Sequence, residues 1–280
     1  MDPIRRLRRP ALRTPRAVMA FEGWNDACDA ASGAVAFLLG QTSADPYAVV
    51  EPEEFYDFQV HRPQVVIDGG GTRSIDWPTT RAFAVELPGQ PHDLVAVTGD
   101  EPNYRWKTYT RVVAALMSES DVEMVITLGA FIGQVTHTQP VPIVGVATDP
   151  DLLVEYDLPS SSYEGPTGIV GVMLEACREV GIPALSLWAA TPHYLAANPN
   201  PSAMLALLDR AASVAGVAID TTELAAAATE FHDRVDAALD SNDEFAEYVR
   251  RLEHDEEPTD PGFGGGVLVS EIEDFLRHRD

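Results

Sequence analysis

Short apolar runs alternate with amphipathic segments through the first two thirds of the chain. Runs of four to eight apolar residues between turn residues are typical of strands, and apolar positions three or four residues apart are typical of helices. The pattern predicts strands at 16–21, 47–50, 55–60, 65–67, 75–77, 82–87, 94–98, 124–128, 143–147 and 184–189, and helices at 25–40, 104–118 and 167–180. Alternating strands and helices indicate an α/β fold, and two hairpins that interrupt the alternation indicate a mixed sheet.

Residues beyond 200 read differently. The pattern predicts helices at 202–214, 221–239 and 243–253, a loop at 258–266 and a short last helix, with no strand between them. We therefore divide the chain into a basic N-terminal arm at 1–15 that we expect to be disordered, a core domain at 16–219 and an acidic helical extension at 220–280.

Charge and composition exclude several classes of function. The chain has 280 residues, 44 acids against 19 bases, a net charge of −25 and 45% hydrophobic residues. Six arginines lie in the first sixteen residues, so the body is even more acidic and is not expected to bind nucleic acid. No apolar stretch reaches membrane-span length, and two cysteines make no disulfide framework. We expect a soluble, cytoplasmic protein.

Candidate chemistry lies at the carboxyl ends of the predicted strands, where open α/β sheets collect ligands. Asn25 and Asp26 supply hydrogen bonds or cap a helix, Glu101 a carboxylate, and His193 a donor that titrates near neutrality. Turn and cap chemistry alone explains the same residue types. The ligand-binding candidates are Gly23, Trp24, Asn25, Asp26, Asp100, Glu101, Gly168, His193 and Tyr194.

Catalytic and metal signals are weak. The glycine run at 68–72 is followed by strand-like residues, so a hairpin tip fits it better than a phosphate loop. Cys28 begins a predicted helix and His193 is a possible base for it, but a buried cysteine is the simpler reading. Histidine and cysteine spacings predict no metal site, and nothing indicates a cofactor or a catalytic residue.

Four separated segments carry a family resemblance: Phe-Glu-Gly-Trp-Asn-Asp-Ala-Cys-Asp-Ala-Ala at 21–31, Gly-Asp-Glu-Pro-Asn-Tyr-Arg-Trp at 99–106, Tyr-Glu-Gly-Pro-Thr-Gly at 163–168 and Ala-Thr-Pro-His-Tyr at 190–194. Together they resemble an actinobacterial-type member of the proteasome assembly chaperone 2 family over residues 15–255. The resemblance implies a three-layer α/β/α core similar to purine nucleoside phosphorylases, helices after it, and a homo-oligomer, with a trimer as one form.

The resemblance also implies protein partners, because eukaryotic and archaeal relatives bind or assemble proteasome core particles. Some do so through a C-terminal tail with a penultimate tyrosine, which this sequence lacks: it ends Phe-Leu-Arg-His-Arg-Asp. We therefore expect a protein-binding, assembly-chaperone-like function through self and proteasome contacts. The alternatives are binding or turnover of an anionic or nucleoside-like ligand by the strand-end loops, and a purely structural oligomer.

Overall fold

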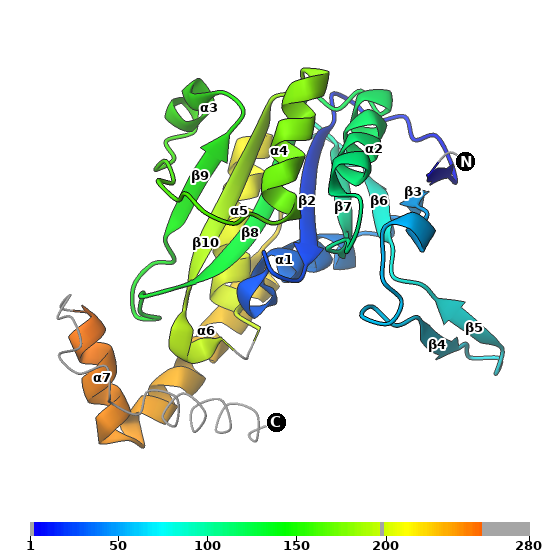
Figure 1. Ribbon diagram of the computed structural model, residues 1–280. Helices are drawn as coiled ribbons and strands as arrows, with labels where there is room; N and C mark the ends of the chain where they lie inside the picture. Colours follow the sequence, from blue (N-terminus) through cyan, green and yellow to red (C-terminus); the bar gives the residue numbers. More distant parts are fainter. Residues whose placement is uncertain (1–2, 197–198, 254–280) are drawn as a thin grey trace.

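The computed structural model describes residues 3–196 and 199–253, and its centre is one eight-stranded sheet (Figure 1). The strand order is β1-β3-β6-β7-β2-β8-β10-β9. The strands are β1 (Ile4–Arg6), β2 (Arg16–Glu22), β3 (Pro46–Val50), β6 (Thr80–Val85), β7 (Leu94–Asp100), β8 (Met124–Gly133), β9 (Ile143–Ala147) and β10 (Ala184–Pro192).

The sheet is mixed, as the sequence predicts. Strands β7, β2, β8 and β10 run parallel to one another, whereas β1, β3, β6 and β9 pair antiparallel with their neighbours. The four central strands therefore bring their carboxyl ends to the same edge of the sheet.

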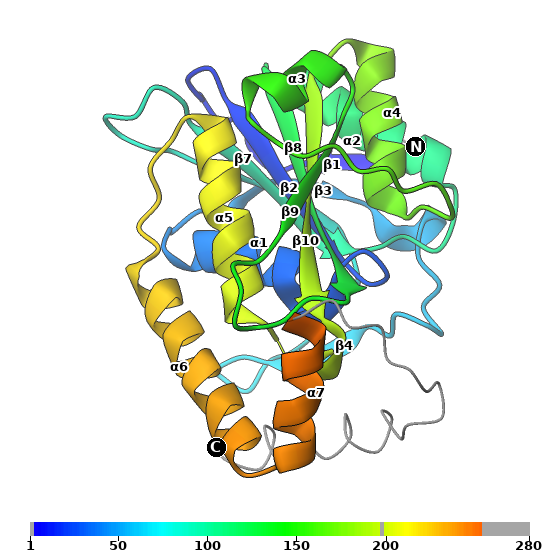
Figure 2. The same cartoon turned by 90° about the vertical axis from the view of Figure 1, so that its left-hand side faces the viewer.

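Helices cover both faces of the sheet and make a three-layer α/β/α sandwich (Figure 2). Strand β2 shows why both faces are covered: Val18 and Ala20 pack under one pair of helices, and Met19 and Phe21 under the other. A strand that is apolar on both sides needs cover on both sides. One face carries α1 (Ala30–Gly40) and α5 (Pro201–Ala215), and the other carries α2 (Trp106–Glu119) and α4 (Ile169–Val180).

Two further helices follow the core, as expected for a helical extension. Helices α6 (Thr222–Asp240) and α7 (Asp243–Glu253) pack against each other and enclose a third apolar cluster with Tyr194 and Leu195. The short α3 (Pro150–Glu155) lies beside β9. The predicted loop at 258–266 and the predicted last helix lie outside the described residues, and the division at residue 220 stays a prediction.

A separate hairpin, β4 (Gln64–Ile67) and β5 (Arg73–Asp76), extends away from the sheet at lower right in Figure 1. Its turn holds the glycine run at 68–72, which confirms the predicted hairpin tip. The side chain of Asp68 accepts hydrogen bonds from the amides of Gly70 and Thr72 at 2.9 and 2.8 Å and thereby closes the turn.

Two sequence predictions are wrong. Residues 55–60 form no strand: Phe55 and Tyr56 follow a 3-10 turn at Pro52–Glu54, and both are buried instead of alternating. The N-terminal arm is ordered from residue 3, because β1 pairs with β3 and arginines bond to acids of the core. Arg6 contacts Glu119 at 2.8 Å and Arg13 contacts Asp93 at 3.1 Å.

Among the described helices, none combines the length and the apolarity that crossing a bilayer requires.

Candidate functional site

The candidate site lies where the parallel strands end. Strand β2 ends at Glu22 beside Asp100, the last residue of β7, and the loop after β2 returns to β8. There the amide of Ala130 donates to the carbonyl of Asn25 at 2.8 Å. The loops after β2 and β7 are therefore held side by side at the centre of the sheet.

Glu101 fastens these loops to helix α4. Its Oε1 accepts a hydrogen bond from Asn25 Nδ2 and another from the backbone amide of Ile169, both at 2.7 Å. Ile169 is the first residue of α4, and a carboxylate at a helix N-terminus is favoured by the helix dipole. Gly168 allows the close approach, because a Cβ there would lie 2.2 Å from Asn25 Nδ2. The first amide of α4, which could otherwise contact a bound anion, is thus bonded by the chain's own carboxylate.

Asp26 does the same for helix α1. Its Oδ1 accepts from the amides of Ala31 and Ser32 at 2.7 and 3.2 Å, so Asp26, not Asn25, caps this helix. The predicted helix start at residue 25 is wrong because Cys28 and Asp29 both have left-handed backbone angles, with φ of 57° and 49°. These two residues turn the chain before α1 begins at Ala30.

Acidic groups accumulate at this edge. Burial, followed by the nearby charges of Asp100, Asp26 and Asp29, raises the pKa of Glu22 above its ordinary value. Burial also raises the pKa of Asp26, although the amides that it accepts from oppose the effect. The edge therefore concentrates acidic groups, which favours a cationic ligand over an anionic one.

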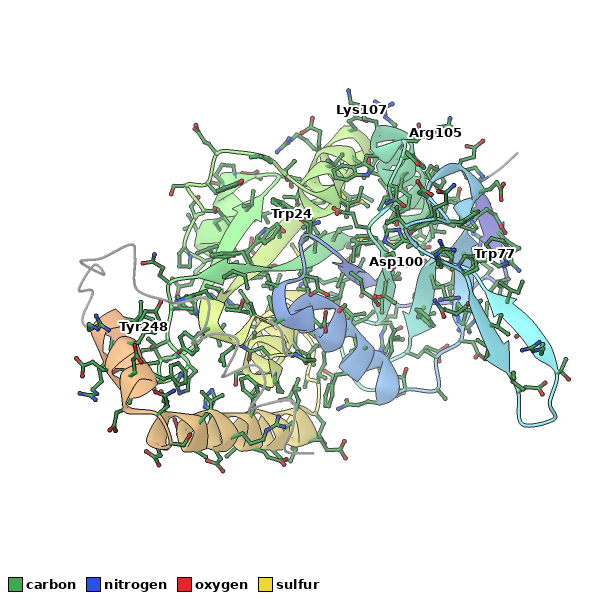
Figure 3. The ribbon with its side chains drawn as sticks, turned by 60° about the horizontal axis from the view of Figure 1, so that its bottom comes forward. Trp24, Trp77, Asp100, Arg105, Lys107 and Tyr248 are labelled. Carbon is green, nitrogen blue, oxygen red and sulfur yellow. The ribbon has the colours of Figure 1, made fainter. Side chains whose placement is uncertain are left out.

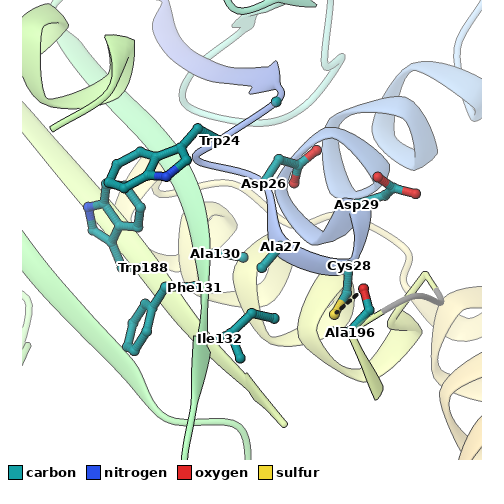
Figure 4. A pocket seen from close by; sticks show the side chains of 11 residues that line it. Trp24, Asp26, Ala27, Cys28, Asp29, Ala130, Phe131, Ile132, Trp188 and Ala196 are labelled. Carbon is teal, nitrogen blue, oxygen red and sulfur yellow. Dashed lines mark hydrogen bonds between the residues drawn. The ribbon is translucent and has the colours of Figure 1, made fainter. Parts of the chain in front are cut away.

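A pocket of about 570 Å³ opens beside these acids (Figure 4). Trp188 forms part of its wall and lies over Gly129, where a Cβ would come within 2.7 Å of the indole. Trp24 is 62% exposed, and Phe131 and Ile132 are also exposed. The pocket is lined by Gly23, Trp24, Asp26, Ala27, Cys28, Asp29, Ala130, Phe131, Ile132, Trp188 and Ala196.

The structure brings only part of the predicted set to this pocket. Gly23, Trp24 and Asp26 line it. Asn25, Glu101 and Gly168 lie just behind it in the internal hydrogen-bond cluster, and Asp100 ends β7. Whether these residues bind a ligand stays a prediction.

The last two candidates, His193 and Tyr194, lie in a different cluster under α6 and α7. The Tyr194 hydroxyl accepts from the backbone amide of His137 at 2.9 Å and hydrogen-bonds its Nδ1 at 2.7 Å. His193 Nε2 hydrogen-bonds the hydroxyl of Tyr248 on α7. Tyr194 is fully buried, and neither it nor His193 lines the pocket beside Trp24.

Nucleophilic chemistry at Cys28 is not supported. Burial raises the pKa of its thiol, so the thiolate is disfavoured, and its Sγ faces the carbonyl of Leu195 at 3.6 Å. Its possible base, His193, is bonded to Tyr248 instead. Within residues 3–196 and 199–253, no group of three or more potential ligands is placed to hold a metal ion.

Sequence reasoning missed the apolar wall. Phe131 and Ile132 belong to the same strand as the apolar run at 124–128, and Trp188 lies within the predicted strand at 184–189. The available signal was the position of two large apolar residues directly after a buried strand. Trp188 gave no signal, because its neighbour across the sheet depends on strand order.

The chain is similar to a known protein family over most of its length. The sequence profile of the PAC2 family matches residues 20–239. A PAC2 family protein from Streptomyces avermitilis is 50% identical with a TM-score of 0.79, over 84% of this chain and 99% of that one. A Mycobacterium tuberculosis proteasome-assembly chaperone homologue is 41% identical with a TM-score of 0.76, over 83% and 99%.

A more distant structure shares the fold. Pyrococcus furiosus PbaB, an archaeal proteasome activator, is 20% identical with a TM-score of 0.65, over 85% of this chain and 99% of that one. No curated protein matches the sequence.

Proposed function

Because the chain belongs to the PAC2 family, we propose that it is a cytoplasmic, homo-oligomeric protein that binds other proteins, proteasome subunits among them, and assists their assembly without catalysing a reaction. Membership confirms the resemblance drawn from the four sequence motifs. Two similar structures, a proteasome-assembly chaperone homologue and an archaeal proteasome activator, support the choice of partner.

One observation carries the proposal. The polar side chains that a ligand would use at the strand ends are consumed by internal contacts: Glu101 holds Asn25 and α4, and Asp26 holds α1. Aromatic and apolar side chains, including Trp24 and Ile132, are left exposed at the surface beside the acids Glu22 and Asp29. An exposed apolar patch with an acidic rim is typical of a protein-binding surface.

The test uses purified proteasome α and β subunits from the same organism. We expect the chain to form a complex of fixed stoichiometry with α subunits or half-particles and to raise the rate at which core particles form, read by native mass spectrometry over time. A Trp24→Ala variant should lose most of this effect, whereas Val154→Ala, which removes an even more exposed apolar side chain from α3, should retain it. No complex and no change in assembly rate would reject the proposal.

The second candidate function is binding of a small ligand, which the 570 Å³ pocket favours because its volume lies within the usual range of about 300–1,000 Å³. The acids around it support a cationic ligand better than the anionic or nucleoside-like one that the sequence indicated. Native mass spectrometry of gently purified protein separates the candidates. A small-molecule adduct on a partner-free oligomer, abolished by Trp24→Ala, would favour this second function.

A further inference from the structure

The hairpin β4–β5 exposes an apolar face that no residue in the described part of the chain covers. All eight residues of its two strands are exposed, and Figure 1 shows the hairpin standing away from the sheet. A two-stranded hairpin alone in water is at best marginally stable, so packing against another surface is needed to hold it. The strand register shows which side would pack.

Cross-strand pairs share a face of the hairpin. Val65 lies opposite Ile75, and Ile67 lies opposite Arg73, so one face presents three apolar side chains and a guanidinium. The other face pairs Val66 with Ser74 and Gln64 with Asp76 and is mostly polar. Trp77 continues the apolar face toward the base of the hairpin, where its ring contacts that of Phe58 at 4.8 Å (Figure 3).

The charges of the hairpin differ from those of the body. Both acids in the hairpin are already bonded: Asp68 closes the turn, and Asp76 pairs with Arg81 at 2.5 Å. Arg62 and Arg73 make no ion pair with any residue in the described ranges. The hairpin therefore offers apolar side chains and unpaired positive charge on a molecule whose net charge is −25.

The pocket beside Trp24 offers the complementary surface. It combines exposed aromatic and aliphatic side chains, Trp24, Phe131 and Ile132, with the exposed carboxylate of Asp29. Its volume of about 570 Å³ leaves room for more than one side chain. A guanidinium beside an exposed indole and a carboxylate gains cation–π and ionic contacts, while an isoleucine fills the apolar part.

We propose that the protein-binding surface at Trp24 and Ile132 takes a second copy as its partner: the hairpin of one copy docks, by its Val65, Ile67, Ile75 and Arg73 face, into the Trp24–Ile132 pocket of the next. This inference rests on the homo-oligomer of the proposed function and names its interface. Donor and acceptor are different surfaces of one chain, so the contact is head to tail and closes into a ring if the rotation between copies permits. Figure 3 shows Trp24 near the centre of the view and Trp77 at the base of the hairpin.

The experiment compares three single substitutions in the full chain by sedimentation velocity and native mass spectrometry. Ile67→Asp damages the donor, Ile132→Asp damages the acceptor, and Val154→Asp is the control, because Val154 is 81% exposed on α3 away from both surfaces. We expect the wild type and the control to be oligomeric. We expect the donor and acceptor variants to be monomeric, with association weakened roughly 30-fold or more, as for a hot-spot residue. Unchanged circular dichroism would show that each variant folds.

Mixing the two damaged variants gives the decisive result. The intact hairpin of the Ile132→Asp chain can enter the intact pocket of the Ile67→Asp chain. The hairpin and the pocket that remain free on this pair both carry the damaging substitution, so no third chain can bind. We expect 1:1 dimers and nothing larger. A monomeric wild type, an oligomeric Ile67→Asp or Ile132→Asp variant, or a mixture that does not pair would each overturn the inference.

These outcomes are separate from those of the proposed function. A ring that forms as expected from a chain that leaves proteasome subunits unaffected would reject the proposed function and leave this interface standing. A chain that assists subunit assembly but has an oligomeric Ile67→Asp variant would reject the interface alone.

Discussion

Glu101 and Asp26 each occupy a helix N-terminus, where their carboxylates accept backbone amides of α4 and α1. In a ligand-binding α/β protein these amides are free to contact a bound anion. Here the carboxylates neutralise both helix dipoles from within, so the strand-end polar residues hold loops together. The residues that meet solvent include the aromatic and aliphatic side chains of Trp24, Phe131 and Ile132 beside the exposed acids Glu22 and Asp29.

Substitution of Glu101 measures that structural contribution. Glu101→Ala removes the acceptor of two hydrogen bonds and leaves the Asn25 amide, on a fully buried residue, unpaired. We expect the free energy of unfolding in urea to fall by about 1–3 kcal/mol. Glu101→Gln keeps an oxygen acceptor and should cost less. Glu164→Ala removes an exposed glutamate and is the control; equal stability of Glu101→Ala and this control would contradict the assignment.

Ionisation of Glu22, at the same edge, should make the stability of the fold depend on pH. Burial and neighbouring acids raise its pKa in the folded state, so the folded protein binds this proton more tightly than the unfolded chain does. The ionised side chain therefore destabilises the fold above its raised pKa, and the penalty disappears as pH falls below the ordinary glutamate value.

We expect Glu22→Gln to raise the melting temperature by a few degrees near pH 8, and this gain to shrink as the pH is lowered toward about 5. Differential scanning calorimetry of the two proteins across this range provides the measurement. Glu164→Gln should show no such trend. A gain that grows toward acid pH would show that the sign of the Glu22 effect is wrong.

At the scale of elements, sequence predicted the central strands well because β2, β7, β8 and β10 are apolar on both faces and stand out as continuous runs. Sequence-based prediction failed where the structure of a segment depends on contacts with residues far away in the chain. Phe55 and Tyr56 are apolar because their turn packs over α2, where the Phe55 ring lies 5.4 Å from that of Tyr109. The N-terminal arm is ordered through acids far along the chain, such as Glu119. Such pairings follow from strand order, which periodicity does not encode.

The candidate site was likewise predictable only where its residues follow directly from the local sequence pattern. Residue types at strand ends located Gly23, Trp24 and Asp26 in the loop after β2. The wall opposite them comes from β8 and β10, so finding Trp188 requires knowing which strands are neighbours. His193 and Tyr194 also follow a strand, yet the helical extension covers them.

Tyr194 tests how α6 and α7 are attached. Tyr194→Phe preserves the ring but removes the hydroxyl that accepts the buried amide of His137. We expect a loss of about 1–3 kcal/mol in the free energy of unfolding and faster hydrogen exchange of α6 amides, because His137 in turn hydrogen-bonds Asp236 of α6 at 3.2 Å. Amides of α2, on the opposite face of the sheet, should exchange faster only by the factor that corresponds to the loss in the free energy of global unfolding.

The matched control is Tyr163→Phe, which removes an exposed hydroxyl that hydrogen-bonds the carbonyl of Pro166. It should change stability by less than about 0.5 kcal/mol. If the two variants behave alike, the buried hydroxyl of Tyr194 does not hold the helical extension.

At the scale of the whole molecule, a net charge of −25 opposes both folding and the association of copies. Described ion pairs such as Arg5–Glu51 and Arg111–Glu179 are exposed and contribute little individually. Two copies that meet head to tail bring equal charges of the same sign together, so apolar contact must outweigh repulsion. Among the described segments, the hairpin suits this role, because it joins an apolar face to the guanidinium of Arg73.

Ionic strength therefore separates global repulsion from local ion pairing. From about 0.01 M to about 1 M sodium chloride, the Debye length falls from about 30 Å to about 3 Å, which screens repulsion across the whole surface but leaves apolar contact intact. We expect the melting temperature to rise by several degrees and self-association to tighten over this range, measured by scanning calorimetry and sedimentation velocity. Chloride is chosen over sulfate because sulfate strengthens burial in any protein. Dissociation on adding salt would mean that ion pairs, rather than the apolar face of the hairpin, hold the copies together.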